Sequence, residues 1–327
     1  QVAVEATNAS TTQCYNPTKR DWAFELLERL ELPREIFGPV VEPGTSLGPI
    51  RNDIRGETGL AADVEVVLPA THDTASAVLA VPATTGESGA PPDWCYISSG
   101  TWSLMGMEVR QPVLSPACLR HNFTNEGGVG GTIRLLKNIA GLWLLQECRR
   151  AWQREGRAYD WEQIGRAAEE AEPLVSLIDP DDPSLVAPDD MPATIRKLCA
   201  ARGEKVPATD GAVARCALES LALKSRQVLQ WLQEITETQL RTIHIVGGGA
   251  RNRLLCQMTA DACKLPVIAG PFEATAVGNL MMQAVAAGVV GSVDEARTVI
   301  RDSFDVVHYR PRNPQAWDDA FARFGGR

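Results

Sequence analysis

Short apolar runs separated by polar turns follow one another through the first third of the chain. Residues 64–68 form an apolar run that predicts a buried strand. The polar turn His72–Asp73 comes next, and then an alanine-rich helix over 74–79 that stops at Pro82. A strand that leads into a helix through a polar turn is typical of α/β proteins. This pattern therefore predicts an α/β fold.

The rest of the chain continues the alternation of strands and helices. Strands are predicted at 94–99, 103–109 and 242–246. Helices are predicted at 21–32 with Asp21 as its N-cap, 57–62, 138–152, 212–240 (as one helix or two), 251–264 and 274–289. Residues 1–20 are rich in Asn, Ser and Thr and are expected to form a loop or a strand edge. Residues 38–56 and 173–192 are rich in glycine, proline or polar residues and are expected to be irregular, the latter as a surface loop.

The segment 82–93 has the composition of a linker, with three prolines and two glycines among its small and polar residues. We therefore place a domain boundary there, with residues 1–82 in one domain and 83–327 in another. The length of 327 residues is enough for about two domains. No internal repeat is visible in the sequence.

The composition and net charge of the chain indicate which kinds of molecule it can bind. Hydrophobic residues make up 44% of the chain and charged residues 22%, as in an ordinary globular protein. The net charge is −9, which argues against nonspecific binding to nucleic acid or to an anionic membrane. A nucleotide stays compatible with this charge, because local backbone N–H groups and magnesium can meet its phosphates.

No apolar run approaches the ~20 residues that span a bilayer, and the first residues do not resemble a signal peptide. The eight cysteines contain no C-x-x-C pair, which favours free thiols and a cytoplasmic location. Cys199 and Cys216 would form a disulfide only if two helices brought them together, and the sequence leaves that open.

Asp73 is the first candidate for chemistry. A carboxylate held just after a strand can accept the proton of a sugar hydroxyl as its oxygen attacks a phosphorus atom. The alternative is structural, because an aspartate at this position can also cap the following helix. His72 and Thr74 flank it and are either substrate ligands or ordinary hydrogen-bonded turn residues.

Two glycine-containing turns are candidates for binding phosphate. In the turn 98–103, Gly100 allows a close approach to phosphate oxygens and the Thr101 hydroxyl can donate to one, although an ordinary hairpin has the same composition. The run Gly247-Gly248-Gly249 follows a strand and lacks Cβ atoms, so a flat nucleotide moiety can lie on its backbone. It is not the dinucleotide-binding G-x-G-x-x-G pattern.

The predicted helix 138–152 places Asn138 and Gln146 two turns apart on one side. Either amide is able to hydrogen-bond a nucleotide, and either is equally compatible with a solvated helix surface. Trp143 and Trp152 are interpreted as core residues rather than as a stacking platform.

Taken together these segments resemble the FGGY family of carbohydrate kinases, and within it the members that phosphorylate L-rhamnulose. The resemblance extends over essentially the whole chain and rests on residues 6–10, 71–78, 98–106, 124–128, 136–146, 244–249 and 267–274. It implies an actin/Hsp70-like (ribonuclease H-like) fold. In that fold, residues 1–82 would belong to the sugar-binding N-terminal domain and residues 83–327 to the nucleotide-binding C-terminal domain.

The resemblance also implies roles. Asp73 would be the base that activates the 1-hydroxyl of the sugar, with His72 and Thr74 beside the substrate. Thr101, Asn138, Gln146 and Gly248 would contact ATP, and Mg²⁺ would bridge its phosphates. No residue of this chain is assigned to the metal.

One family feature is missing from the sequence. Family members begin with an Asp-x-Gly-Thr/Ser phosphate loop, and this chain contains none. We therefore expect ~150 further residues before it, about one domain. Without them, residues 1–82 are expected to expose sheet edges and apolar surface that favour self-association. Two alternatives stay open: a nucleotide-binding chain without catalysis, or a kinase for another sugar such as L-fuculose or D-xylulose.

Overall fold

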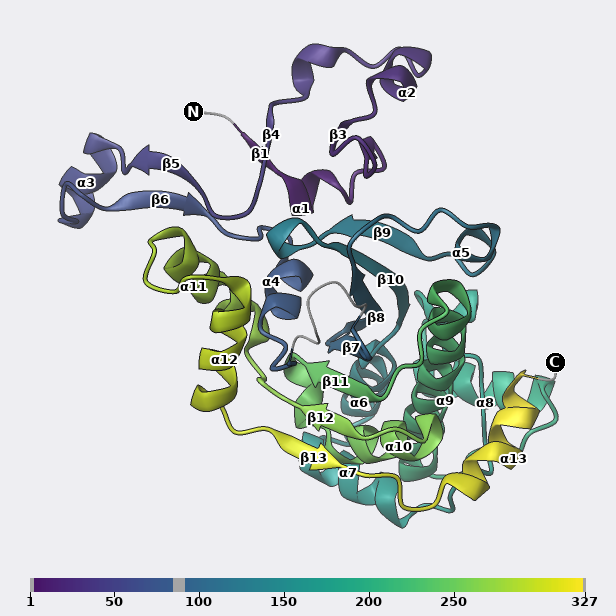
Figure 1. Ribbon diagram of the computed structural model, residues 1–327. Helices are drawn as coiled ribbons and strands as arrows, with labels where there is room; N and C mark the ends of the chain where they lie inside the picture. Colours follow the sequence, from purple (N-terminus) through teal and green to yellow (C-terminus); the bar gives the residue numbers. More distant parts are fainter. Residues whose placement is uncertain (1–2, 85–91, 326–327) are drawn as a thin grey trace. The chain divides into compact units, whose positions relative to one another are not determined.

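The computed structural model describes residues 3–84 and 92–325, which form two compact units. The first unit consists of Gln1–Pro92, Met107–Leu136 and Glu273–Asp305, and the second of Asp93–Gly106, Lys137–Phe272 and Val306–Arg327. The chain passes from one unit to the other within strands β8 (Trp102–Val109) and β10 (Ile133–Ala140), so neither unit is a single stretch of sequence (Figure 1).

A mixed sheet runs through the second unit in the order β13-β12-β11-β7-β8-β10. Its further strands are β7 (Trp94–Ser99), β11 (Thr242–Val246), β12 (Val267–Ala269) and β13 (Val307–Tyr309). Strand β11 is parallel to both β7 and β12, while β8 is antiparallel to β7. Because β7 and β11 are parallel neighbours, the turns that follow them lie at the same edge of the sheet.

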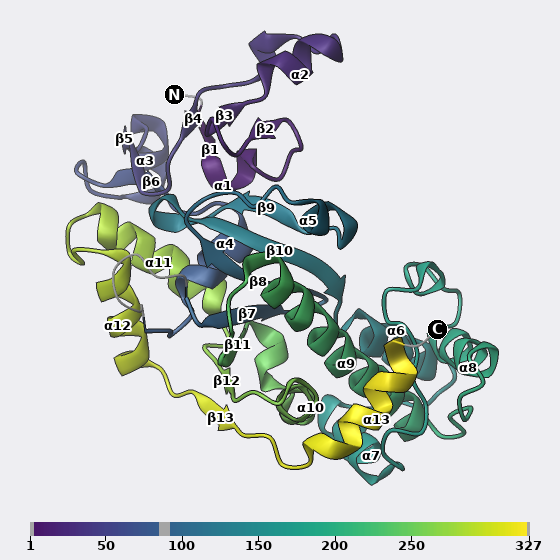
Figure 2. The ribbon, with the colours of Figure 1, turned by 45° about the vertical axis from the view of Figure 1, so that its right-hand side comes forward.

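Helices pack around one long helix, α9 (Asp210–Thr236), in the second unit. Thr209 caps its first turn by accepting a hydrogen bond from the Ala212 N–H (3.1 Å), and Glu237 ends it in the left-handed conformation. It contacts α6 (Trp143–Arg154), α7 (Trp161–Glu170), α8 (Met191–Ala201), α10 (Arg253–Cys263) and α13 (Pro314–Gly325) (Figure 2). The hydrophobic core of this unit lies among these helices.

The first unit contains short strands and helices. Its N-terminal elements are β1 (Val4–Glu5), α1 (Ala6–Ala9), β2 (Tyr15–Asn16), β3 (Asp21–Trp22), α2 (Phe24–Arg29), β4 (Val40–Val41), β5 (Thr45–Pro49), α3 (Asn52–Thr58), β6 (Glu65–Leu68) and α4 (Asp73–Leu79). Its later elements are α5 (Pro116–Arg120), β9 (Thr124–Gly127), α11 (Ala274–Ala286) and α12 (Val293–Ser303). Strand β9 pairs antiparallel with the first half of β10, and α4 packs against α11. Single-turn 3₁₀ helices lie at Arg34–Ile36, Val129–Gly131, Pro183–Leu185 and Gly248–Arg251 of the two units.

Several predicted elements are confirmed and several need correction. The strands at 94–99 and 242–246 and the helix after Asp73 are confirmed, and α9 is one helix rather than two. The predicted helix 21–32 is shorter, because Asp21 and Trp22 pair with β2 as a strand and Asp21 caps nothing. Strand β6 is present but not buried, since its residues are exposed or half-buried beside β5.

The region 38–62 was wrongly predicted as irregular chain followed by a short helix. It contains strands β4 and β5 and helix α3, which ends at Gly59 with φ +72°. The glycines and prolines of this region are typical of irregular chain, which is why the sequence predicts no strand there. Strand β5 nevertheless pairs with β6, which lies further along the chain.

The predicted helix 138–152 is the largest error, because its first residues belong to strand β10 and its helix, α6, begins only at Trp143. Asn138 and Gln146 therefore do not share a helix face. Residues on both faces of β10 are buried, so its apolar spacing resembles that of a buried helix. The predicted surface loop 173–192 contains the 3₁₀ turn Pro183–Leu185 and the start of α8, and Leu177 and Ile178 are fully buried within it.

The predicted domain boundary lies in the segment 82–93, of which residues 85–91 are outside the described residues. The division into residues 1–82 and 83–327 stays a prediction.

Candidate functional site

Asp73 lies at the first turn of α4, just after the loop that leaves β6. Its carboxylate oxygen Oδ1 accepts hydrogen bonds from the Thr74 backbone N–H (2.6 Å) and the Thr74 hydroxyl (3.2 Å). The Asp73 side chain is 78% exposed, whereas Thr74 is buried. The carboxylate is thus oriented by the protein and open to a molecule that approaches from solvent.

Buried polar groups fix the segment 70–76, which we name the Asp73 segment. The carboxylate of Glu5 is buried and accepts hydrogen bonds from the Thr71 backbone N–H (2.8 Å) and from the Thr71 hydroxyl (2.8 Å). The Thr7 hydroxyl accepts one from the His72 N–H (3.1 Å). Since a buried polar group is costly unless it is hydrogen-bonded, this network favours one backbone conformation.

Helix α4 also approaches α11 closely. A Cβ atom on Gly278 of α11 would lie 1.8 Å from the Ser76 carbonyl oxygen, so only glycine fits there. Next to this contact the Thr275 hydroxyl donates to the Asp73 carbonyl oxygen (3.3 Å). Both contacts hold the start of α4, and with it Asp73, against α11. The two helices lie side by side (Figure 1).

His72 lies between the carboxylate of Asp73 and a buried arginine. Its Nδ1 is 3.9 Å from Asp73 Oδ1 and 3.4 Å from Arg134 Nη2. Burial lowers the pKa of His72, and the positive charge of Arg134 lowers it further, while the carboxylates of Glu126, Asp73 and Glu5 oppose the shift. Burial and Arg134 together favour the neutral form of the ring.

In the second unit, the turn between β7 and β8 carries Thr101. Gln146 Nε2 of α6 lies 3.3 Å from the Thr101 hydroxyl oxygen and donates to it. Gly141 makes the approach possible, because a Cβ on it would lie 2.5 Å from the Thr101 carbonyl oxygen. The structure thus brings Thr101 and Gln146 together, although the sequence placed Gln146 beside Asn138 instead.

The three consecutive glycines, named the glycine turn (Gly247–Gly249), follow β11. Gly247 has φ +83°, which favours glycine. Gly249 is packed on Ser99, whose Oγ would be 2.0 Å from an added Cβ. A Cβ on Gly248 would meet nothing within 4 Å, and Gly248 is exposed. The fold therefore explains two of the three glycines, and the third leaves an open backbone surface on which a ligand can lie.

Asn138 belongs to strand β10 rather than to a helix, and its side chain is exposed. Beside it Lys137 is half-buried, and burial lowers its pKa. At the end of the same strand, the backbone N–H of the buried Ala140 donates a hydrogen bond to the Asp181 carboxylate (2.8 Å). Asp181 also forms an ion pair with the buried Lys224 (3.2 Å), so charged groups fix the end of this strand.

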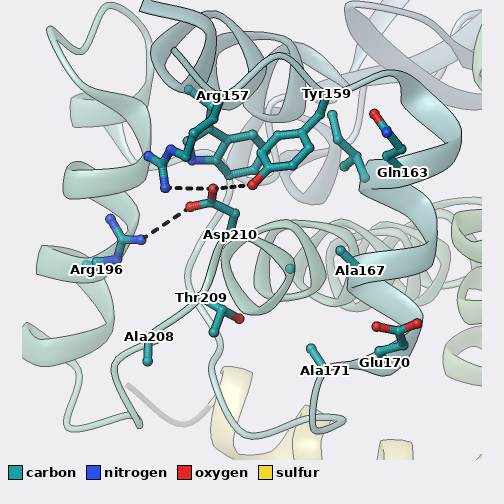
Figure 3. Close-up of a pocket in the computed structure, with 13 residues that line it drawn as sticks. Arg157, Tyr159, Gln163, Ala167, Glu170, Ala171, Arg196, Ala208, Thr209 and Asp210 are labelled. Atoms are coloured by element: carbon teal, nitrogen blue, oxygen red, sulfur yellow. Dashed lines mark hydrogen bonds and ion pairs between the residues drawn. The ribbon is translucent and has the colours of Figure 1, made fainter. Parts of the chain in front are cut away.

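A cavity of about 560 Å³ opens in the second unit among α6, α7, α8 and the start of α9 (Figure 3). None of the sequence-predicted site residues lines it. Asp210 holds its polar groups together, because it pairs with Arg157 (2.8 Å) and Arg196 (3.9 Å) and accepts from the Tyr159 hydroxyl (3.2 Å). These groups satisfy one another, so the cavity is not a strong candidate for the site.

Among the described residues, no group of three or more His, Cys, Asp or Glu side chains is placed to hold a metal ion. The same residues include no helix long and apolar enough to cross a membrane. All eight cysteines are free thiols, with Cys199 and Cys216 Sγ atoms 3.7 Å apart. Burial raises the pKa of the Cys256 and Cys263 thiols to about 12.

Sequence reasoning missed Glu5, Arg134 and Gly141. Arg134 carries the clearest signal, as a single charge in the apolar run 133–136, where a buried charge needs partners. Glu5 and Gly141 carry no local signal, because their role depends on contacts with Thr71 and Thr101, which are distant in sequence.

Most of the chain matches the models of one protein family. Residues 95–287 match the C-terminal domain of the FGGY family of carbohydrate kinases, and residues 1–80 match its N-terminal domain. The chain belongs to the FGGY family of carbohydrate kinases.

Two relatives are named as rhamnulokinases. The enzyme from Bacteroides thetaiotaomicron is 44% identical over 324 residues, which are 99% of this chain and 64% of the relative. That from Bacillus subtilis is 41% identical over 96% of this chain and 62% of the relative. The chain thus spans about three-fifths of the length of the curated relatives that it matches.

Solved structures confirm the expected actin/Hsp70-like α/β fold. A ligand-bound xylulose kinase from Lactobacillus acidophilus superposes with a TM-score of 0.75 at 15% identity, covering 99% of this chain and 63% of that one. Plasmodium falciparum glycerol kinase with ADP superposes with a TM-score of 0.74 at 14% identity, covering 100% and 62%. At these identities the likeness shows the fold alone.

Proposed function

We propose that this chain is part of a kinase that transfers the γ-phosphoryl group of ATP to the 1-hydroxyl of L-rhamnulose. The products are L-rhamnulose 1-phosphate and ADP, as in the breakdown of rhamnose. The relatives named rhamnulokinase, at 44% and 41% identity, favour this sugar. The observation that carries the chemistry is the carboxylate of Asp73, which is exposed while the backbone of the two residues before it is held by hydrogen bonds to the buried Glu5 and Thr7.

Asp73 is the general base in this proposal. Its carboxylate accepts the proton of the sugar 1-hydroxyl while the hydroxyl oxygen forms a bond to the γ-phosphorus and the bond to the β-phosphate oxygen breaks. The Thr74 N–H keeps the carboxylate in one orientation, and His72 lies beside it as a substrate ligand. Thr74 itself is buried, so we assign it to orienting Asp73 as well as to the substrate side.

Thr101, Asn138, Gln146 and Gly248 bind ATP in this proposal. The Thr101 hydroxyl is exposed beside Gln146, and Gly248 offers a backbone surface without a side chain. We expect backbone N–H groups of these turns to meet the phosphates, as they do in other glycine-rich anion sites.

Mg²⁺ would shield the phosphate charges when bound with the nucleotide. The described residues do not form a site of three acidic, histidine or cysteine ligands for it. Mg²⁺ is usually held by substrate phosphates, waters and only one or two carboxylates, so we assign it no residue and derive no step through it. A cytoplasmic location is proposed with the function, in keeping with the free thiols.

A coupled assay of ADP release tests the proposal. L-rhamnulose, L-fuculose, D-xylulose and glycerol are compared as acceptors, with this chain and with the longest product that its gene encodes. We expect L-rhamnulose to give the highest kcat/KM. A preference for another sugar would reject the substrate but not the family, and nucleotide binding without turnover in both proteins would favour a non-catalytic chain.

A further inference from the structure

Arg134 is a buried cation beside the proposed substrate site. None of its surface is exposed, and its guanidinium is fixed by two further contacts. Its Nε donates to the Gly127 carbonyl oxygen (2.8 Å), and its Nη2 lies 3.1 Å from the Glu126 carboxylate. Strand β9 therefore contacts both Nε and Nη2 of Arg134. These contacts hold Nη2, the nitrogen that faces His72, in place.

The contact between Arg134 and His72 determines where the imidazole proton lies. Nη2 is 3.4 Å from Nδ1, and a guanidinium has donors only, so Nδ1 must be the acceptor. An accepting Nδ1 carries no proton, which leaves the single proton of a neutral ring on Nε2. The side chain of His72 is 23% exposed, so part of this ring reaches the surface beside Asp73.

We propose that Arg134 is a positioning residue that holds His72 as the neutral Nε2–H tautomer, so that Nε2–H donates a hydrogen bond to an oxygen of the ketose substrate. This inference rests on the proposed function for its substrate, but not for the tautomer. The charged groups that face the ring are Arg134 from β10, Glu126 from β9, Asp73 from α4 and Glu5 from β1.

The arrangement also divides two tasks. Asp73 accepts a proton and must be an acceptor, whereas a neutral Nε2–H is a donor and cannot compete with it for the proton. A charged imidazolium at 3.9 Å would instead pair with the carboxylate and weaken it as a base. The buried arginine therefore keeps the base available while it orients the donor.

Nitrogen-15 NMR of histidine-labelled protein tests the tautomer directly. The chain has four histidines, and a His72→Gln variant assigns the His72 signals. We expect a proton-bearing Nε2 and a proton-free Nδ1 at pH 7. A protonated Nδ1, or a ring that is charged at pH 7, would overturn the inference and leave the proposed function intact.

Sugar binding tests whether His72 Nε2–H donates a hydrogen bond to the substrate. Saturating L-rhamnulose should shift the His72 Nε2 signal, and inactivity of the whole enzyme with every sugar would reject the proposed function while leaving the tautomer standing. In kinetics of the longest gene product, His72→Gln keeps an amide N–H near the Nε2 position, and His72→Asn keeps one near Nδ1. We expect His72→Asn to raise the sugar KM about tenfold more than His72→Gln, with kcat changed less. Equal KM values together with an unshifted Nε2 signal would reject donation to the substrate.

An arginine variant tests the positioning role. In Arg134→Met the pKa of His72 should rise toward its ordinary value, because a cation beside the ring is lost. The matched control is Arg297→Met, which removes another buried arginine of the same unit, paired with Glu108 (2.6 Å). It should leave the His72 titration unchanged. An identical His72 titration in both variants would reject the role of Arg134. If Arg134→Met does not fold, the nitrogen-15 spectrum of the unaltered protein still tests the inference, because a protonated Nδ1 would reject it.

Discussion

The Asp73 segment and the glycine turn solve different problems with different parts of the chain. The Asp73 segment is built from side chains, since Glu5, Thr7 and Thr74 fix a loop that presents one carboxylate. The glycine turn is built from backbone, and its exposed residue Gly248 has no side chain at all. A proton acceptor needs one oriented side chain, whereas a surface that binds phosphate or nucleotide needs backbone N–H groups that no side chain covers.

Replacing the base should have the largest effect. We expect Asp73→Asn to lower kcat with L-rhamnulose roughly 10²–10⁴-fold, because the amide cannot accept the proton. The affinity for ADP, measured by calorimetry, should stay the same, since the nucleotide residues are untouched. Asp63→Asn, an exposed aspartate before β6, is the control and should keep normal kcat. If Asp73→Asn retains full turnover, the two regions do not divide the work in this way.

The second-largest effect is expected from a larger side chain in the contact between α4 and α11, which holds the Asp73 segment. Gly278→Ala would place a Cβ 1.8 Å from the Ser76 carbonyl oxygen, so α4 and α11 must separate. We expect the free energy of unfolding in urea to fall by about 1–3 kcal/mol. The control Gly165→Ala adds a Cβ with nothing within 4 Å in helix α7, and it should raise stability slightly. Equal stability of the two variants would show that the close packing is not needed.

Within the glycine turn, neighbouring positions should respond in opposite ways. Gly248→Ala meets nothing within 4 Å, so we expect stability within about 0.5 kcal/mol of the original and an ADP affinity about tenfold weaker. Gly249→Ala meets Ser99 and should lower the melting temperature instead. Unchanged ADP affinity in Gly248→Ala would remove this residue from the nucleotide site.

The smallest effect concerns pH. The pKa of His72 is lowered in the folded protein, so the unfolded chain takes up the proton first as pH falls. Stability should therefore be lost below about pH 6.5, the ordinary histidine value, down to the lower folded-state pKa. His72→Gln should show a shallower loss over this window in urea unfolding at several pH values. An unchanged slope would mean that other groups dominate.

The two regions also differ in how far the sequence predicts them. The glycine turn and the 98–101 hairpin are local, and their strands, β7 and β11, are where the apolar runs predict them. The start of α4 at Asp73 is local too. What fixes Asp73, however, comes from Glu5 and Gly278, which are distant in sequence, and no local pattern indicates such partners.

Strand β10 shows a second reason why the sequence prediction failed, which is that a buried strand can have the apolar spacing of a helix. Its apolar residues are buried on both faces, so their spacing does not distinguish a strand from a buried helix. The error moved Asn138 onto a helix with Gln146. Arg134, the buried charge that contacts His72, lies in the first half of β10, for which the sequence predicted no element. The roles proposed for the site residues came from resemblance to a family, while their support comes from contacts that only the folded chain contains.

The proposed reaction moves the γ-phosphoryl group of ATP to the 1-oxygen of L-rhamnulose. Phosphorus NMR of a reaction of the longest gene product with ATP and L-rhamnulose tests it most directly. We expect phosphomonoester signals that all couple to the two protons on carbon 1, formed together in equal amount with ADP. ADP formed with inorganic phosphate in place of the phosphomonoester, or a phosphoester on another carbon, would reject this transfer.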